Sequence, residues 1–343
     1  RVQANGQLAW IDRQPWQFRI AAQGIDVTQI RPDVPGRVNV TGTIGGEGFE
    51  ATSPWTARIA SMSGTLFQRA LTGRGEISHR DGAYDLKQVR ISNGTSTLDV
   101  NGRYGQTMDL RWQANLQSLA IVLPGMSGRL QSSGSARGTL ERPEIVGELH
   151  LRDLKYGDVV VGQADGVLDV DVSDRRASRI ELRASDAVAG GVRFDDVNLR
   201  LAGLAREHGL DLEIVSPGSP HRKLAPFRGR ATIAGAYDAA HHLWRGTLNE
   251  TRVVFDDGEA KLLQPAAIEL SPELTRLAPL CIAAAESRLC IEGEQYRRAV
   301  ADGRSRNDVA AHRSAVANLP RTEDAQHIAQ RGKFVGQLIL DVG

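Results

Sequence analysis

The sequence predicts an all-β protein built from one elongated, repetitive antiparallel sheet with few or no helices. From Met108 to Leu116, apolar and polar residues alternate at nine successive positions. Successive side chains of a strand point to opposite faces, so this segment has one apolar and one polar face. Similar alternation recurs along the chain. The chain also has 36 glycines, where an average composition would give about 24, and this excess indicates many turns between short strands.

The alternating segments are separated by turn-forming residues such as Pro35-Gly36 and Asp257-Gly258. Asn93-Gly94 is the strongest short hairpin signal in the chain. Asp195-Asp196 shifts the phase of the alternation, which predicts a β-bulge. In chain order, the alternating segments are 16–20, 38–40, 55–59, 84–92, 95–101, 108–116, 149–151, 168–172, 180–184, 192–194, 197–201, 210–214, 266–270 and 338–342.

Helical signals are few. Residues 116–123 are compatible with a short helical turn before Pro124, and residues 294–317 with either a helix that Gly303 interrupts or a loose hairpin. No apolar run approaches 18 residues, so we expect no helix that spans a bilayer.

A weak internal repeat begins at Gly36, Gly128 and Gly229, which are 92 and 101 residues apart. Each copy reads Gly-Arg-apolar and ends with Gly six positions later. Trp16-Gln17 precedes the first copy and Trp112-Gln113 precedes the second. The pattern predicts a unit that is stacked more than once, although such turns also arise by chance in a glycine-rich β protein.

We expect residues 1–343 to be one continuous β segment of a longer protein. The chain begins without Met and ends just after an alternating stretch. Any membrane anchor or export signal would then lie outside it. The expected sub-units are 1–105, 106–225, 226–293 and a less regular 294–343.

Composition and motifs argue against several classes of function. The net charge is +1 with no basic stripe, so we expect no nucleic-acid partner. His241-His242 would point to opposite faces of a strand, so we expect a solvated turn rather than a metal site. Asp169–Asp174 lacks the Gly and Glu of a calcium loop, and no helix or Lys follows Gly45–Gly48 as a phosphate loop requires. We predict no enzyme, no catalytic residue, no metal and no cofactor.

Cys281 and Cys290 lie in two short apolar segments joined by a polar turn. A hairpin would place them opposite each other, within the spacing that a disulfide requires. Two buried free thiols are the alternative, and the residues alone leave both open.

The apolar faces of these strands must be buried somewhere. A sealed core between two sheets is the simpler arrangement, and an open apolar trough is the other. Scarce aromatic residues and a pattern without a centre favour the trough, but they do not decide the question. The candidate lining residues are Met108, Leu110, Trp112, Leu116, Leu168, Val170, Val172, Ile180, Leu182, Leu199, Leu201, Leu210, Leu212, Ile214, Leu338 and Leu340.

The order of several short segments resembles the middle region of the TamB family, the inner-membrane subunits of the translocation and assembly module, which are AsmA-like proteins. These segments are Asn93–Gly102, Leu119–Gly128, Gly138–Leu149, Trp244–Leu248, Leu263–Ala266, Leu280–Ile282 and Leu289–Gly293.

The resemblance implies a β-taco, which is a U-shaped sheet with an apolar groove. It also implies a periplasmic location in a Gram-negative cell, with an inner-membrane anchor outside this chain. The implied functions are phospholipid transport toward the outer membrane and support of autotransporter assembly with the outer-membrane barrel protein TamA, through regions outside this segment. An oxidising periplasm would favour a Cys281–Cys290 disulfide. The alternatives are a chaperone that binds unfolded strands by β-augmentation, a structural stalk with a sealed core, and an enzyme within residues 294–343.

Overall fold

The structure, a computed structural model, describes residues 1–10, 14–50, 52–123, 125–219, 224–272, 274–284 and 287–296. Within these residues it contains β-strands and two short 3-10 turns, η1 (Val27–Gln29) and η2 (Leu119–Ile121), which confirms the all-β prediction. The strands are β1 Val2–Leu8, β2 Pro15–Asp26, β3 Gly36–Glu47, β4 Trp55–Leu66, β5 Arg69–Arg80, β6 Ala83–Asn93, β7 Ser96–Tyr104, β8 Met108–Leu116, β9 Ser127–Gly138, β10 Pro143–Tyr156, β11 Val159–Asp171, β12 Ser178–Ala189, β13 Val192–Leu204, β14 Glu207–Ser216, β15 Phe227–Asp238, β16 Leu243–Phe255, β17 Gly258–Leu262, β18 Ala266–Leu270, β19 Leu274–Ala284 and β20 Ser287–Tyr296.

Several local predictions can be checked directly. β8 has the predicted bounds, Met108–Leu116. The hairpin at Asn93-Gly94 is present, with its turn one residue later at Gly94-Thr95. The short helical turn before Pro124 is η2. The stretch 294–317 lies outside the described residues, except for its first three residues, which end β20.

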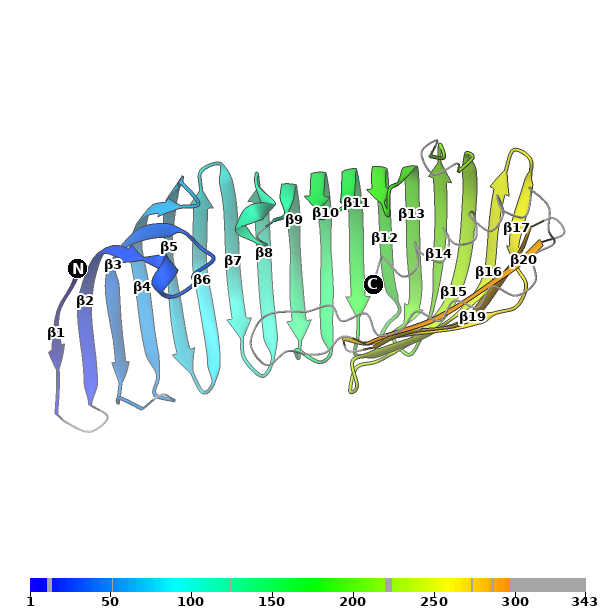
Figure 1. The fold of residues 1–343 in the computed structure, drawn as a ribbon. Coiled ribbons are helices and arrows are strands. Elements are labelled where there is room, and N and C mark those ends of the chain that lie inside the picture. The colour runs from blue at the N-terminus through cyan, green and yellow to red at the C-terminus, as the bar shows by residue number, and fades with distance from the viewer. Residues whose placement is uncertain are drawn as a thin grey trace. The chain divides into compact units, whose positions relative to one another are not determined.

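The chain divides into two compact units, Arg1–Arg152 and Asp153–Gly343. The first unit is an antiparallel meander in which each strand from β1 to β9 pairs with the next one along the chain (Figure 1). The smaller sub-units expected from the sequence stay a prediction.

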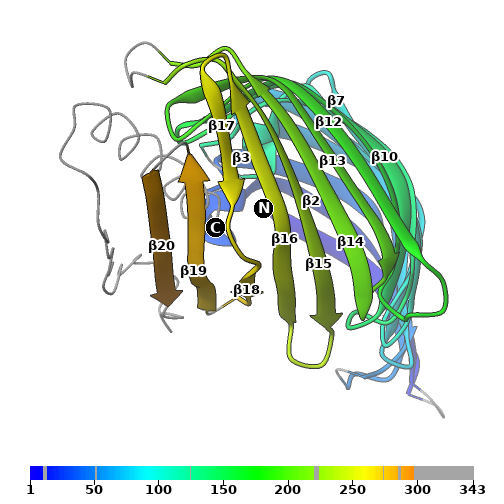
Figure 2. The same cartoon turned by 90° about the vertical axis from the view of Figure 1, so that its right-hand side faces the viewer.

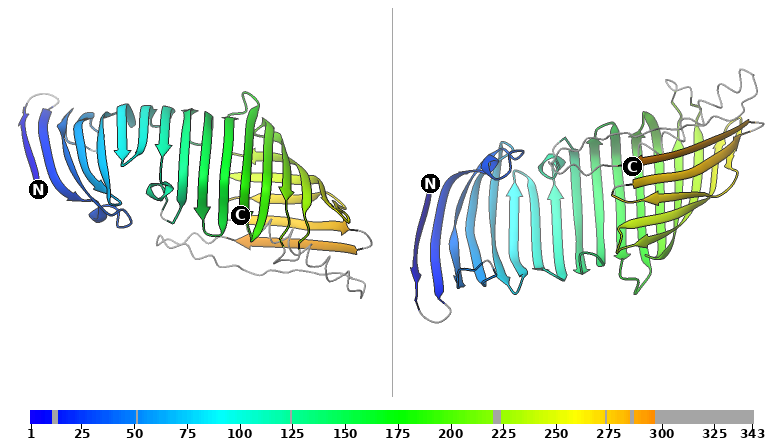
Figure 3. Two further views of the ribbon diagram at one scale, coloured as in Figure 1. Left: turned by 90° about the horizontal axis from the view of Figure 1, so that it is seen from above. Right: turned by 60° about the horizontal axis from the view of Figure 1, so that its bottom comes forward.

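In the second unit, β11 to β16 continue as a meander. β16 then pairs with β17 near one end and with β18 near the other, and β19 pairs with both of these short strands before it pairs with β20. Figures 2 and 3 show that this sheet curves, so that β19 and β20 stand opposite β13 and β14.

A line of β-bulges crosses the first unit. β2, β4 and β6 each carry one residue more than their partners, close to Gly24, Ala60 and Gln88 respectively, where the pairing register shifts. Gly24 and Gln88 adopt positive φ angles of 64° and 49°. A bulge bends its strand and increases the local twist. The three bulges lie on alternate strands, and those of β4 and β6 lie at nearly the same level of the intervening strand β5.

The phase shift expected at Asp195-Asp196 has a different cause. Val192 and Phe194 are buried, and the apolar side chains resume at Val197. On the facing strand, Asp186 has a positive φ of 52°. Asp186 and Asp195 are both left out of the β12–β13 pairing. One residue is omitted on each strand, so the inward-facing positions of β13 shift by one residue while the pairing register stays the same. The pairing of β11 with β12 skips Gly162 and Asp186 at the same level. The predicted bulge is therefore an irregularity that crosses β11, β12 and β13.

The two faces of each sheet differ sharply in chemistry. The exposed face carries cross-strand ion pairs, such as the one between Arg58 Nη2 and Glu76 Oε2 at 2.6 Å. Lys87 Nζ lies 3.2 Å from the other oxygen of the Glu76 carboxylate. Hydrogen bonds from Arg58 and Lys87 hold the pKa of Glu76 below its usual range. In the second unit Glu269 likewise joins Arg245 and Arg276. The exposed face therefore carries cross-strand ion pairs, and the opposite face carries the apolar rows.

The internal repeat marks equivalent strands. Its three copies fall in β3, β9 and β15, which are six strands apart. Each of these strands follows a long connection, formed by residues 27–35, 117–126 and 217–226. η1 packs against β3 and η2 packs against β9. The repeat is thus a six-strand unit that begins with a long connection.

The turn after β11 is organised by Asp171, whose side chain is buried with 1% exposure. Oδ1 accepts hydrogen bonds from the backbone N–H and hydroxyl of Ser173, and Oδ2 accepts from the N–H of Arg176 at 3.0 Å. Burial raises the pKa of Asp171, but these hydrogen bonds lower it by more, so it lies below its usual value. The segment 169–174 is therefore a strand end and a turn.

We expect Asp171→Ala to destabilise the protein by about 2–3 kcal/mol at pH 7, because several buried hydrogen bonds to a carboxylate are lost. The pKa of Asp171 is lower in the folded chain than in the unfolded chain. Its stabilisation is therefore present above an unfolded pKa of about 3.9 and is lost as the pH falls through the folded value. Urea denaturation at pH 7 and pH 3 should show a smaller difference between variant and wild type at pH 3. An equal difference at both pH values would contradict this role.

Candidate apolar binding face

Aliphatic side chains on one face of the second unit form continuous rows across the strands. Ladder pairing joins Leu168 to Ile180, Ile180 to Leu201, and Leu201 to Leu210. The same row continues through Ile233, Leu248 and Ala266 on the next strands. A parallel row joins Leu182, Leu199, Leu212 and Ala231. Side chains directly opposite each other on adjacent strands are in contact range, so each row is a continuous apolar surface.

These rows are half-buried from β11 to β15, whereas Leu248 and Ala266 are buried. At the β15 end of the rows, Ala231 and Ile233 pack against the buried cluster that Leu248 and Ala266 form with Leu277, Leu280 and Ile282 of β19. The row residues from β11 to β14 lie beside apolar partners on the adjacent strands.

The structure brings most of the predicted lining residues onto these faces. Met108, Leu110, Trp112, Leu168, Val170, Ile180, Leu182, Leu199, Leu201, Leu210, Leu212 and Ile214 are half-buried strand residues, and Leu116 is buried. Val172 differs, because β11 ends at Asp171 and Val172 lies in the following turn. Leu338 and Leu340 lie outside the described residues. Whether this face binds a ligand stays a prediction.

The first unit has a comparable row that the sequence only partly revealed. Leu110 on β8 faces Gly102 on β7 and Ala136 on β9. From Gly102 the row runs back through neighbouring strands to Leu86, Ile77, Ala57, Ile44 and Phe18. Several of these positions are Gly or Ala, which do not stand out as apolar in a sequence pattern.

Tryptophan rings lie against glycine backbones on this face. A Cβ added at Gly134 would lie 2.5 Å from Cζ2 of Trp112, and one at Gly46 would lie 2.9 Å from Cζ2 of Trp16. Trp244 approaches Gly235 in the same way, at 2.7 Å. Rings placed over glycines keep the surface shallow, and they account for part of the high glycine content.

We expect Gly235→Ala to destabilise the protein by about 1–3 kcal/mol, because the added Cβ would overlap the Trp244 ring and Nε2 of His208. Gly209→Ala is the matched control. Gly209 lies on the adjacent strand, and nothing lies within 4 Å of its added Cβ. We expect the control to change stability by less than about 0.5 kcal/mol. Equal thermal unfolding of the two variants would contradict this packing role.

The two ends of the strands differ within each unit. One end is closed by apolar packing, and we call it the closed end. In the first unit it contains Val38, Leu71, Leu116 and Leu119, all buried. In the second unit Val192, Phe194, Leu224 and Phe227 form a buried cluster there.

The other end carries aromatic side chains with polar atoms, and we call it the aromatic end. In the first unit Trp55, His79, Tyr84 and Tyr104 are successive partners across β4 to β7. In the second unit Trp244 Nε1 donates to His208 Nε2 at 2.8 Å, and Tyr237 faces Trp244 across the ladder. Sequence analysis missed this feature, because its residues are far apart in the chain.

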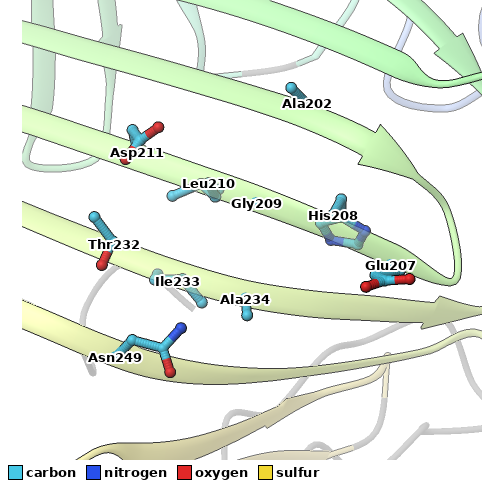
Figure 4. Close-up of a pocket in the computed structure, with 10 residues that line it drawn as sticks. All are labelled: Ala202, Glu207, His208, Gly209, Leu210, Asp211, Thr232, Ile233, Ala234 and Asn249. Carbon is cyan, nitrogen blue, oxygen red and sulfur yellow. The ribbon is translucent and has the colours of Figure 1, made fainter.

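A shallow depression of about 480 Å³ lies on the second unit near β14 (Figure 4). Ala202, Gly209 and Ala234 are cross-strand partners that leave little side-chain volume there. Glu207 and Asp211 also line it. Its lining mixes these polar side chains with Leu210 and Ile233, which also belong to an aliphatic row.

The cysteine pair lies on the last described hairpin. Cys281 and Cys290 face each other across β19 and β20 with their Cα atoms 4.0 Å apart, and the structure joins them by a disulfide.

The predicted turn at His241-His242 is confirmed: both residues are exposed, and His241 Nδ1 lies 2.7 Å from Asp238 Oδ2. Within the described ranges, no cluster of three or more His, Cys, Asp or Glu has metal-site geometry. Those ranges also contain no helix with the length and apolarity needed to cross a membrane.

Comparison with known proteins identifies the family. The model of the TamB N-terminal domain matches residues 1–306. The chain belongs to the TamB family. The sequence resemblance had pointed to the family's middle region, whereas the matching TamB model describes an N-terminal domain. TamB, the translocation and assembly module subunit of Haemophilus influenzae, is 19% identical over 291 residues, which are 83% of this chain and 22% of that protein. The chain thus spans about a fifth of the length of this TamB relative. No solved structure gives a significant match.

Proposed function

We propose that this chain is a periplasmic segment of a TamB-like protein and that its apolar face carries phospholipid acyl chains between the inner and outer membranes. The observation that supports this proposal is the set of aliphatic rows that run from strand to strand and are only half-buried from β11 to β15. Large apolar surfaces that face no protein partner mark binding sites for lipids or proteins.

The chemistry of the rows fits an acyl chain. Each buried methylene contributes about 0.8 kcal/mol. Successive positions such as Leu201 and Leu210 are nearly equivalent, so a bound chain could shift from one position to the next at little energetic cost. Such transfer requires no catalytic group, which is consistent with a transport role rather than an enzyme.

The partners follow from the family. The relative's name describes a subunit of a translocation and assembly module. We infer that the full-length protein is anchored to the inner membrane by a segment outside this chain. We also infer that it works with an outer-membrane TamA-like barrel protein and supports autotransporter assembly.

Mass spectrometry of lipid that co-purifies with the chain tests this function. We expect bound phospholipid that is retained through size-exclusion chromatography and released by organic solvent. Protein without lipid but with bound unfolded outer-membrane polypeptide would favour strand addition instead. Protein with neither would favour a structural stalk.

A further inference from the structure

The apolar rows end differently at the two ends of the strands. At the closed end of the first unit, the η2 segment folds onto the sheet, and Leu119 is 4% exposed. The backbone N–H of Gln117 donates to Ser96 Oγ at 2.9 Å, which ties this segment down. At the closed end of the second unit, the rings of Phe194 and Phe227 pack edge to face with centroids 6.4 Å apart. Both closed ends therefore contain packed, buried apolar side chains.

The aromatic end of the first unit remains accessible. The rings of His79 and Tyr84 lie 4.9 Å apart, and Trp55 contacts both. Tyr84 and Tyr104 are each 40% exposed. The apolar row of Ala57, Ile77 and Leu86 begins two residues further along the same strands. A band of rings with polar atoms thus borders the aliphatic rows.

The second unit repeats this arrangement with other residues. His208 receives a hydrogen bond from Trp244 at Nε2, and its Nδ1 lies 3.1 Å from the carbonyl oxygen of Ala205. An imidazole that accepts at Nε2 carries its proton on Nδ1, so these contacts fix both rings. The hydroxyl of Tyr237 lies 3.4 Å from Nδ1 of His242. Leu210, two residues after His208, and its cross-strand partner Ile233 begin the aliphatic row.

Tyrosine and tryptophan favour boundaries at which one side is apolar and the other is wet, because their rings are apolar and their O–H or N–H groups are polar. We propose that a phospholipid binds each unit in one orientation, with its acyl chains along the aliphatic rows and its polar head group at the aromatic end. This proposal rests on the proposed lipid-carrying function and adds a direction to it.

Two photoreactive phospholipids test the orientation. One carries a diazirine on the head group, and the other carries it near the end of an acyl chain. Each is incorporated into phosphatidylethanolamine vesicles and irradiated with the full chain, and labelled peptides are quantified by mass spectrometry. We expect the head-group probe to label Tyr84, Tyr104 and Tyr237 at least about five-fold more than Ile30 and Val122, which are exposed in the connections at the closed end of the first unit. We expect the acyl probe to label Leu98 and Leu199.

The double variant Tyr84→Leu/Tyr104→Leu tests the role of the two tyrosine hydroxyls, because leucine keeps an apolar side chain at each position and removes the hydroxyl. We expect head-group labelling in the first unit to fall by about three-fold or more while acyl labelling is unchanged. Equal head-group labelling at both ends would overturn the orientation and leave the lipid function standing. Labelling mainly at the closed ends would do the same. No labelling by either probe would overturn the lipid function and this inference with it.

Discussion

Leu201→Asp is expected to reduce crosslinking to an acyl-chain probe by about 30-fold. Leu201 is half-buried in the middle of an aliphatic row, between Ile180 and Leu210. A carboxylate there would lose contact with two or three methylenes of a bound chain, which is about 2 kcal/mol. Aspartate is too short to reach water around the lipid, unlike a longer charged side chain. Photocrosslinking of the purified chain with lipid vesicles measures the effect.

Ala202→Asp is the matched control, because it adds the same charge at the next residue of the same strand. Ala202 is exposed and points to the opposite face. We expect its crosslinking to remain within about two-fold of wild type. Circular dichroism and protease resistance establish that both variants fold. Equal losses in the two variants would show that the charge acts through something other than the apolar face.

Replacement of both cysteines by serine is expected to cost about 2–3 kcal/mol of stability. The disulfide closes a short loop, and a loop of about ten residues gives this value on the chain-entropy model. Leu280 and Ile282, which flank Cys281, belong to a buried cluster with Leu248 and Leu277. Release of the hairpin should therefore loosen this cluster as well as β20.

Hydrogen exchange of the backbone amides in β19 and β20 measures the loss locally. We expect faster exchange in the double variant, and the same increase in wild type after reduction with dithiothreitol. Exchange in β4 to β8, which belong to the first unit, should stay unchanged. A double variant with wild-type protection in β19 would show that the hairpin is held by packing alone.

The strongest sequence patterns located strands well, and the weak ones did not. β8 begins and ends where its uninterrupted alternation does. β9, by contrast, reads Ser-Gly-Arg-Leu-Gln-Ser-Ser-Gly-Ser-Ala-Arg-Gly and shows almost no apolar face. Its inward positions are small because the Trp112 ring occupies the space over Gly134. The neighbouring strand β8 supplies the apolar surface over β9, so the sequence of β9 shows no alternation of apolar and polar residues. This strand could therefore be recognised only from the structure.

The aromatic end illustrates why the candidate site was only partly predictable. Next to the turn between β4 and β5, Leu66 pairs with Arg69, but beyond the bulge Trp55 pairs with His79. The extra residue at Ala60 changes the pairing by one position. A one-residue change moves side chains to the other face, so extrapolation from the turn would have separated Trp55 from His79. The aliphatic rows were easier to predict, because each strand reveals its own apolar face.

The six-strand repeat has a consequence for how such a protein can vary in length. In the first unit, β3 and β9 both follow long connections at the closed end. Six strands at a spacing of about 4.8 Å separate these connections by about 29 Å. Antiparallel strands alternate in direction, so gain or loss of an odd number of strands would move the next long connection to the aromatic end. Gain or loss of an even number of strands keeps every long connection at the closed end. A whole repeat contains six strands, so its gain or loss also preserves the difference between the two ends. Duplication of a repeat would lengthen the apolar surface by a fixed increment and keep its polarity.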